Sequence, residues 1–124
     1  MAYHTPLSRV EGLGSAHSGV EHFWRQRVSA AALVPLSCWL GFSMLNLVGA
    51  SREQVLLFLH APISAVLMVL FVIASVVHMQ LGIQVVIEDY VHHDGNKIVL
   101  LVLNKAFAWA VAAASLFAMY RIAL

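Results

Sequence analysis

A histidine lies deep inside the longest stretch of the chain that carries no Asp, Glu, Lys or Arg. His78 lies within residues 54–87, which are bounded by Glu53 and Glu88. In a helix it would sit about 15 Å below the membrane interface, near the bilayer midplane. An ionisable group at that depth is a candidate functional residue, and neutral imidazole is a good ligand for haem iron. The alternative is a structural histidine hydrogen-bonded to a neighbouring helix, and position alone leaves both open.

Two small residues share a helix face with this histidine. Ser75 precedes His78 by three residues and Gly82 follows it by four. Residues at these spacings are neighbours on a helix surface. We expect this face to allow a flat macrocycle to approach the backbone.

A second group of polar residues directly follows the same apolar stretch, in the order Glu88-Asp89-Tyr90. A tyrosine hydroxyl at the membrane interface can donate a hydrogen bond to a quinone carbonyl, and an adjacent carboxylate can orient that group or relay protons. The alternative is that Tyr90 belongs to the aromatic belt of a membrane helix and that the acids mark its end.

The third group precedes the first apolar stretch, in the order His22-Phe23-Trp24-Arg25-Gln26-Arg27. Arginine at an interface can pair with carboxylates such as haem propionates. The alternative is an anchor in which basic residues and Trp24 hold the helix end at the interface. His92 and His93 are adjacent and so do not share a helix face, which argues against a metal site there.

These residues must be positioned by membrane helices. The chain has 124 residues, of which 61% are hydrophobic and 10% charged. A soluble domain carries about 25% charged residues, so these few charges cannot cover a water-soluble surface. The net charge of +1 indicates no nucleic-acid partner. The sequence predicts an all-α integral membrane protein with the lipid bilayer as its surroundings.

We predict three transmembrane spans, at residues 28–50, 62–87 and 98–121, each long enough to cross a bilayer core of about 30 Å. Residues 1–27 form a short N-terminal segment, and residues 28–124 form a three-helix anchor. Pro62 suits the first turn of the second span. The connection at residues 49–61 contains Ser51-Arg52-Glu53, a polar cluster typical of a helix start.

Basic residues indicate the orientation of the spans. With three spans, the N-terminus and the loop at residues 88–97 lie on the same side. That side collects five of the seven basic residues: Arg9, Arg25, Arg27, Lys97 and Lys105. The positive-inside rule therefore places the N-terminus in the cytoplasm, or in the matrix if the protein is mitochondrial. The protein would lie in a bacterial inner membrane or a mitochondrial inner membrane.

The run from His78 to Val91 resembles a motif of a known family. Histidine is followed by glycine four residues later and by Asp-Tyr at eleven and twelve residues. This pattern is similar to the H-x3-G-x6-DY motif of the membrane-anchor D subunit of succinate dehydrogenase, respiratory Complex II. Residues 19–30 also resemble the family's segment before its first helix. The likeness covers nearly the whole chain and is closest to the alphaproteobacterial and mitochondrial type.

The resemblance implies a role for four residues. His78 matches the axial ligand of haem b, so it would bind the haem iron, and the partner C subunit would supply the other axial histidine. Tyr90 matches the tyrosine that hydrogen-bonds ubiquinone, and Asp89 matches its neighbour at that site. Arg27 matches the arginine near the haem propionates. The implied partners are the C subunit, an iron–sulfur subunit and a flavoprotein subunit, and this chain would not be catalytic alone.

Three functions follow as alternatives. The first is the haem- and quinone-binding anchor of a succinate:quinone oxidoreductase, which passes electrons from the iron–sulfur subunit to quinone. The second is a haem-less structural or assembly subunit of a respiratory complex. The third is a small transporter. The lack of any carboxylate within the three predicted spans argues against this function.

Overall fold

The computed structural model describes residues 6–11 and 18–123, and every regular element in this part of the chain is a helix. The elements are α1 (Pro6–Glu11), α2 (Ser18–Asn46), α3 (Arg52–His60), α4 (Pro62–Tyr90) and α5 (Asp94–Ala123). Helices α2, α4 and α5 are long and apolar enough to cross a membrane. The predicted all-α class with three transmembrane helices is therefore confirmed.

The helices extend beyond the predicted spans at the N-terminal ends of α2 and α5. Helix α2 begins at Ser18, ten residues before the predicted span at residue 28, and α5 begins at Asp94, before residue 98. Polar residues can continue a helix past the apolar part that spans the lipid. The division into residues 1–27 and 28–124 remains a prediction, because a helix boundary does not mark the membrane surface.

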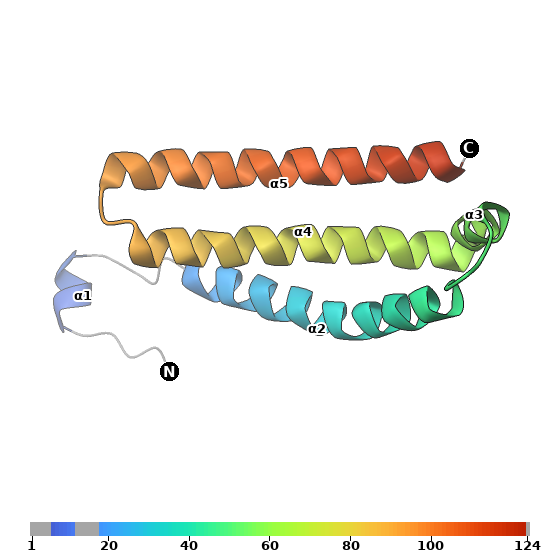
Figure 1. Cartoon of the computed structure of the whole chain (residues 1–124). Coiled ribbons are helices and arrows are strands. Elements are labelled where there is room, and N and C mark those ends of the chain that lie inside the picture. Colours follow the sequence, from blue (N-terminus) through green and yellow to red (C-terminus); the bar gives the residue numbers. More distant parts are fainter. Residues whose placement is uncertain (1–5, 12–17, 124) are drawn as a thin grey trace.

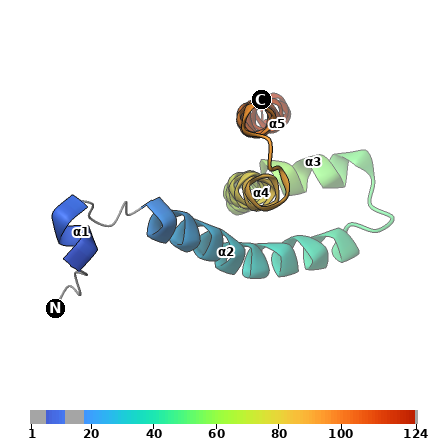
Figure 2. The same ribbon diagram turned by 90° about the vertical axis from the view of Figure 1, so that its left-hand side faces the viewer.

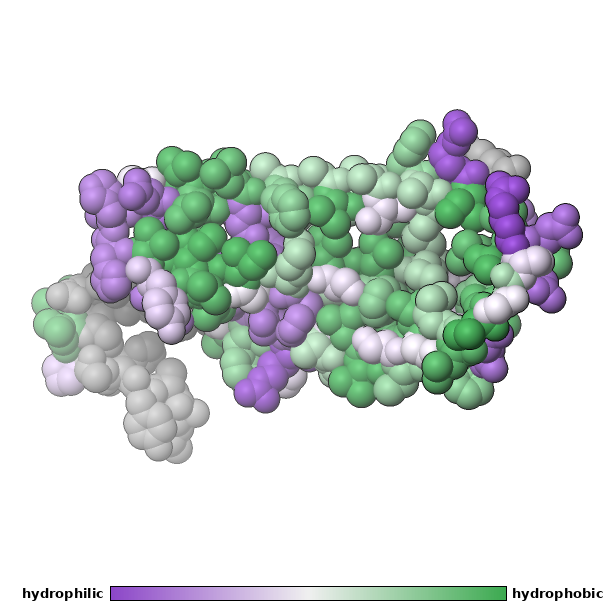
Figure 3. All heavy atoms as spheres, viewed as in Figure 1, coloured by the Kyte–Doolittle hydropathy of each residue, from purple (hydrophilic) through white to green (hydrophobic). Residues whose placement is uncertain are grey.

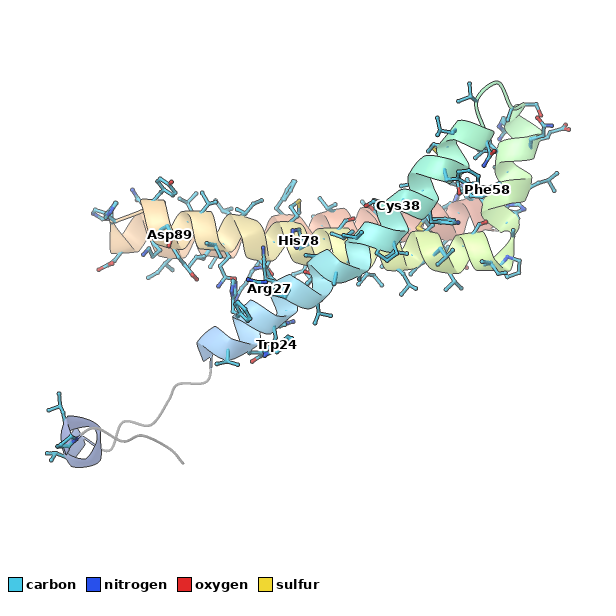
Figure 4. The ribbon with its side chains drawn as sticks, turned by 90° about the horizontal axis from the view of Figure 1, so that it is seen from below. Trp24, Arg27, Cys38, Phe58, His78 and Asp89 are labelled. Atoms are coloured by element: carbon cyan, nitrogen blue, oxygen red, sulfur yellow. The ribbon has the colours of Figure 1, made fainter. Side chains whose placement is uncertain are left out.

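Helix α4 is the central element. Figure 2 shows α4 between α5 on one side and α2 on the other. Figure 1 shows α4 and α5 running side by side along their length. Helix α2 instead crosses α4 diagonally, as Figure 4 shows. The crossing concentrates the contact between α2 and α4 within a limited part of both helices.

Local sequence explains the turns at one end of the bundle. Gly49 has φ +79°, a conformation that L side chains rarely adopt, where the chain leaves α2. Ser51 then caps α3: its hydroxyl accepts from the Gln54 backbone N–H, and the Gln54 side chain accepts from the Ser51 N–H at 2.9 Å. The expected helix start at residues 51–53 is thus confirmed. Pro62 occupies the first turn of α4, as predicted.

Helix α3 lies across the end of the bundle, and two contacts hold it there. Phe58 stacks on Trp39 of α2 with ring centroids 6.0 Å apart. His60 hydrogen-bonds the carbonyl of Ile122 near the end of α5. Figure 2 shows α3 running away from the axis of α4 rather than along it. Helix α3 therefore ties α2 and α5 together at this end.

Little of the chain is buried, and most of the buried side chains are small or polar. Among the described residues, the buried polar side chains are Ser29, Ser43, Ser64 and Asn104, and the buried apolar ones are Leu81, Ile87 and Ala108. Figure 3 shows hydrophobic side chains covering much of the visible face. Lipid is as apolar as leucine, so membrane helices associate through small residues and polar contacts. The exposed apolar surface is suited to lipid or to other membrane helices.

Helix α2 is bowed in Figures 1 and 2. Pro35 lies inside it, where a missing N–H removes one helical hydrogen bond and the ring crowds the preceding turn. The first half of α2 thereby follows a different direction from the second half. This half carries the polar residues that approach α4.

Candidate functional site

His78 lies near the middle of α4, close to the place where α2 crosses it (Figure 4). Its side chain is half-buried, and its Nδ1 is 3.2 Å from the hydroxyl oxygen of Ser29 on α2. Ser29 is itself buried, with 7% of its surface exposed. The sequence-predicted candidate therefore faces a polar partner on another helix and retains an accessible part.

Ser29 belongs to a polar strip on the inner face of α2. His22, Gln26 and Ser29 follow one another at spacings of four and three residues, which places them on one helix face. Within the described part of the chain, Nε2 of His22 and Oε1 of Gln26 are buried without a hydrogen-bond partner. Buried polar atoms are normally paired, by protein or by ordered water, so this strip is an unusual feature of a membrane helix.

Gly82 lies opposite the same strip. A Cβ built at Gly82 would be 3.8 Å from Nε2 of Gln26. The side chain of Gln26 on α2 therefore lies near this glycine, and the approach of a macrocycle at this face stays a prediction. Gln26 lies beside Gly82 and Ser29 lies beside His78, one turn further along, so α2 approaches α4 at two successive levels.

An apolar groove adjoins this pair of contacts. Its volume is about 490 Å³, within the range of small-molecule sites. Both α2 and α4 contribute to it, and the lining residues are Trp24, Arg25, Val28, Ser29, Ala32, Leu36, Leu70, Ile73, Ala74 and Val77. His78 is not in the lining, but its partner Ser29 and its neighbour Val77 are. The groove offers apolar walls next to the histidine.

The two arginines of α2 have different surroundings. Arg25 lines the groove and pairs with Glu21 at 3.6 Å, an exposed contact one turn earlier. Arg27 is absent from the groove lining, and its guanidinium carbon lies 4.7 Å from the ring centroid of Phe23. Both flank Gln26, so both lie about one helical turn from the level of His78, toward the end of α4 that carries Tyr90.

Tyr90 and Asp89 form the last turn of α4 and are exposed, Tyr90 by 76%. Tyr90 is twelve residues from His78, or about 18 Å along the helix. Lys97 of α5 donates to the carbonyl of Glu88 at 3.0 Å and fixes the adjoining turn. The structure thus separates the histidine from the Asp-Tyr pair and leaves the pair open to other molecules.

Sequence reasoning missed Ser29 and Gln26 as parts of this site. Their spacing with His22 was a usable signal, because three polar residues on one face of a membrane helix must meet something other than lipid. His92 and His93 are exposed and lie beyond the end of α4. Within residues 6–11 and 18–123 there is no group of three His, Cys, Asp or Glu residues that could hold a metal ion.

Comparison with known proteins gives consistent matches over most of the chain. The family described as succinate dehydrogenase/fumarate reductase transmembrane subunit matches residues 1–118. The succinate dehydrogenase hydrophobic membrane anchor subunit of Paracoccus denitrificans is 38% identical over 124 residues, which cover 100% of this chain and 95% of that protein. The subunit of the same name from Rickettsia bellii is 32% identical over 86% of this chain and 85% of its own length. A succinate dehydrogenase membrane anchor subunit of Reclinomonas americana is 31% identical, with 73% and 78% covered.

Proposed function

Because the chain belongs to the family of succinate dehydrogenase/fumarate reductase transmembrane subunits, we propose that it is the membrane anchor of a succinate:ubiquinone oxidoreductase and holds haem b at His78. Tyr90 and Asp89 contribute to the ubiquinone site. The anchor is multi-pass, with α2, α4 and α5 crossing the membrane. Succinate chemistry belongs to the other subunits, so this chain alone is not catalytic.

The observation that carries the haem assignment is the hydrogen bonding of His78. The hydroxyl proton of Ser29 is directed to the carbonyl of Gln26 at 2.9 Å. The Ser29 oxygen therefore accepts from Nδ1 of His78 at 3.2 Å, so Nδ1 carries the ring proton. The lone pair then resides on Nε2, in the neutral tautomer that ligates iron. Nε2 of His78 is thus suited to bind haem iron. Haem, when bound, would supply a one-electron carrier within the membrane.

A second ligand for the haem would come from a partner anchor subunit. Among the described residues, His22 lies on the inner face of α2, but it is seven residues from Ser29, or about 10 Å along that helix. That separation places it too far from the level of His78 to bind the same group. This supports a partner anchor subunit that provides the second histidine. The groove beside Ser29 and Val77 provides apolar walls for a macrocycle or for the partner's helices.

The cationic residues near this level support binding of carboxylates. Arg27 is the candidate for the haem propionates, and Arg25 lies at the same level but on the groove side. Among the described residues no carboxylate pairs with Arg27, whose guanidinium lies over the ring of Phe23. It is thus available to an added carboxylate, whereas Arg25 would first have to leave Glu21.

The end of α4 supports the quinone assignment. The exposed Tyr90 hydroxyl can donate a hydrogen bond to a quinone carbonyl, and the carboxylate of Asp89 can orient that donor or deliver a proton. Because both residues are exposed in this chain, the remaining walls of the site come from partner subunits. The iron–sulfur and flavoprotein subunits would dock at this edge and deliver electrons.

The test is a dithionite-reduced minus air-oxidised absorption spectrum of the purified complex. We expect a b-type haem signal in the wild type, loss or alteration of it in His78→Ala, and no change in His93→Ala, which removes an exposed histidine. A wild-type complex with the expected subunits and no haem would instead identify a haem-less structural anchor. Retention of the wild-type signal in His78→Ala would refute the ligand assignment.

A further inference from the structure

We infer that Ser29 is a positioning residue that fixes the tautomer and ring orientation of His78, and this inference rests on the proposed function. The two residues lie on different helices and are 49 positions apart in the sequence. Ser29 would not touch the haem iron. It would act through the imidazole that does.

The burial of Ser29 is the first observation. It is 7% exposed, in a chain whose large apolar side chains are mostly exposed. Burying a hydroxyl is costly unless it is hydrogen-bonded, within its own helix or to another one. The described structure gives it two, the Gln26 carbonyl and the imidazole of His78.

The direction of these two hydrogen bonds is the second observation. A hydroxyl has one proton, and a carbonyl can only accept. The bond to Gln26 at 2.9 Å uses that proton within α2. The contact to Nδ1 at 3.2 Å must then run from the ring N–H to the serine oxygen. One tautomer of His78 is favoured, with Nε2 unprotonated.

A second approach of α2 to α4 lies one turn along α4 from His78. A Cβ at Gly82 would lie 3.8 Å from Nε2 of Gln26, so α2 approaches α4 at two successive levels. The hydrogen bond between Ser29 and His78 therefore forms within a longer region where the two helices lie close together.

The chemical consequence concerns the ligand strength of His78. An acceptor on Nδ1–H makes the imidazole a stronger electron donor at Nε2, and loss of such an outer partner typically lowers metal affinity about 10–100-fold. A stronger donor favours ferric over ferrous iron. Removal of the acceptor should therefore raise the haem midpoint potential, and a tenfold change in the ferric-to-ferrous preference corresponds to about 59 mV for one electron.

The experiment compares four complexes, purified whole: wild type, Ser29→Ala, Ser29→Thr and Ser43→Ala. Ser43 is a matched control, because it is also on α2 and is also 7% exposed. Haem content, the rate of haem transfer to an excess of apomyoglobin, and the midpoint potential are measured. We expect Ser29→Ala to lose haem faster and to have a higher potential. Ser29→Thr, which retains a hydroxyl, and Ser43→Ala should match the wild type.

Two results would overturn the inference while leaving the proposed function intact. One is a wild-type potential and haem retention in Ser29→Ala, with His78→Ala lacking haem. The other is a lower yield of both Ser29 variants with the wild-type potential, which would indicate a packing role. Absence of haem from the wild type, or its full retention in His78→Ala, would refute the proposed function and this inference together.

Discussion

Gly82→Ala tests directly how α2 lies on α4. A Cβ at this position would meet one atom within 4 Å outside its own helix backbone, Nε2 of Gln26 at 3.8 Å. That distance is an ordinary van der Waals contact, and a favourable pair of heavy atoms at such a distance contributes about 0.1–0.2 kcal/mol. The structure therefore predicts no steric penalty for the added methyl group.

The main energetic effect of Gly82→Ala should come from the backbone. Replacing glycine by alanine inside a soluble helix favours the helix by about 1 kcal/mol. Gly41→Ala is the matched control, because Gly41 lies inside α2 and a Cβ there would meet nothing within 4 Å. Thermal unfolding of the purified complex in detergent should give similar midpoints for both variants, neither below that of the wild type.

A lower midpoint for Gly82→Ala, with Gly41→Ala unchanged, would refute this reasoning. It would mean that something other than the Gln26 side chain occupies the space beside Gly82. The haem content of the same samples identifies that occupant. Loss of haem in Gly82→Ala would indicate that the macrocycle packs on this glycine, whereas retained haem would indicate a closer helix from a partner subunit.

Two further predictions concern the C-terminal end of α4 and the start of α3. Tyr90→Phe removes one exposed hydroxyl, so it should raise the KM for ubiquinone while leaving the haem spectrum unchanged. Steady-state quinone reduction measures this KM. An equal effect of Tyr120→Phe, which removes another exposed hydroxyl, would contradict the prediction. Ser51→Ala removes the N-cap of α3 and should destabilise this helix by about 1 kcal/mol, which would be measured as faster hydrogen exchange at residues 52–60. Ser37 is an exposed serine of α2, and Ser37→Ala should leave that exchange unchanged.

The three long helices could be predicted because each carries an apolar stretch long enough for a bilayer. The boundary between α3 and α4 was harder to predict. Residues 54–87 contain no Asp, Glu, Lys or Arg, so hydropathy alone would join both helices into one. Pro62 and the polar residues at 51–53 resolved it, through the physics of the first helical turn. The early start of α2 at Ser18 could not be predicted from hydropathy, because that part of the helix is polar.

The sequence singles out His78 as a candidate residue but does not predict its contacts. His78 was identified because an ionisable group within an apolar stretch is costly there. Its partner Ser29 could not be assigned, because a serine in a membrane helix usually bonds its own backbone, and only the crossing of α2 over α4 brings it to the ring. The proximity of Gln26 to Gly82 could not be predicted for the same reason, since Gln26 comes from another helix.

The unbroken course of α4 has a consequence for how this protein can vary in length. His78 and Tyr90 are joined by helix alone, so their relative direction depends on the number of residues between them. One inserted residue would rotate Tyr90 by about 100° about the helix axis and shift it by about 1.5 Å. Insertions at residues 47–51 or 91–93, which lie between helices, would not change the direction of Tyr90 relative to His78. Changes in chain length should therefore be tolerated in these turns and excluded between the two side chains.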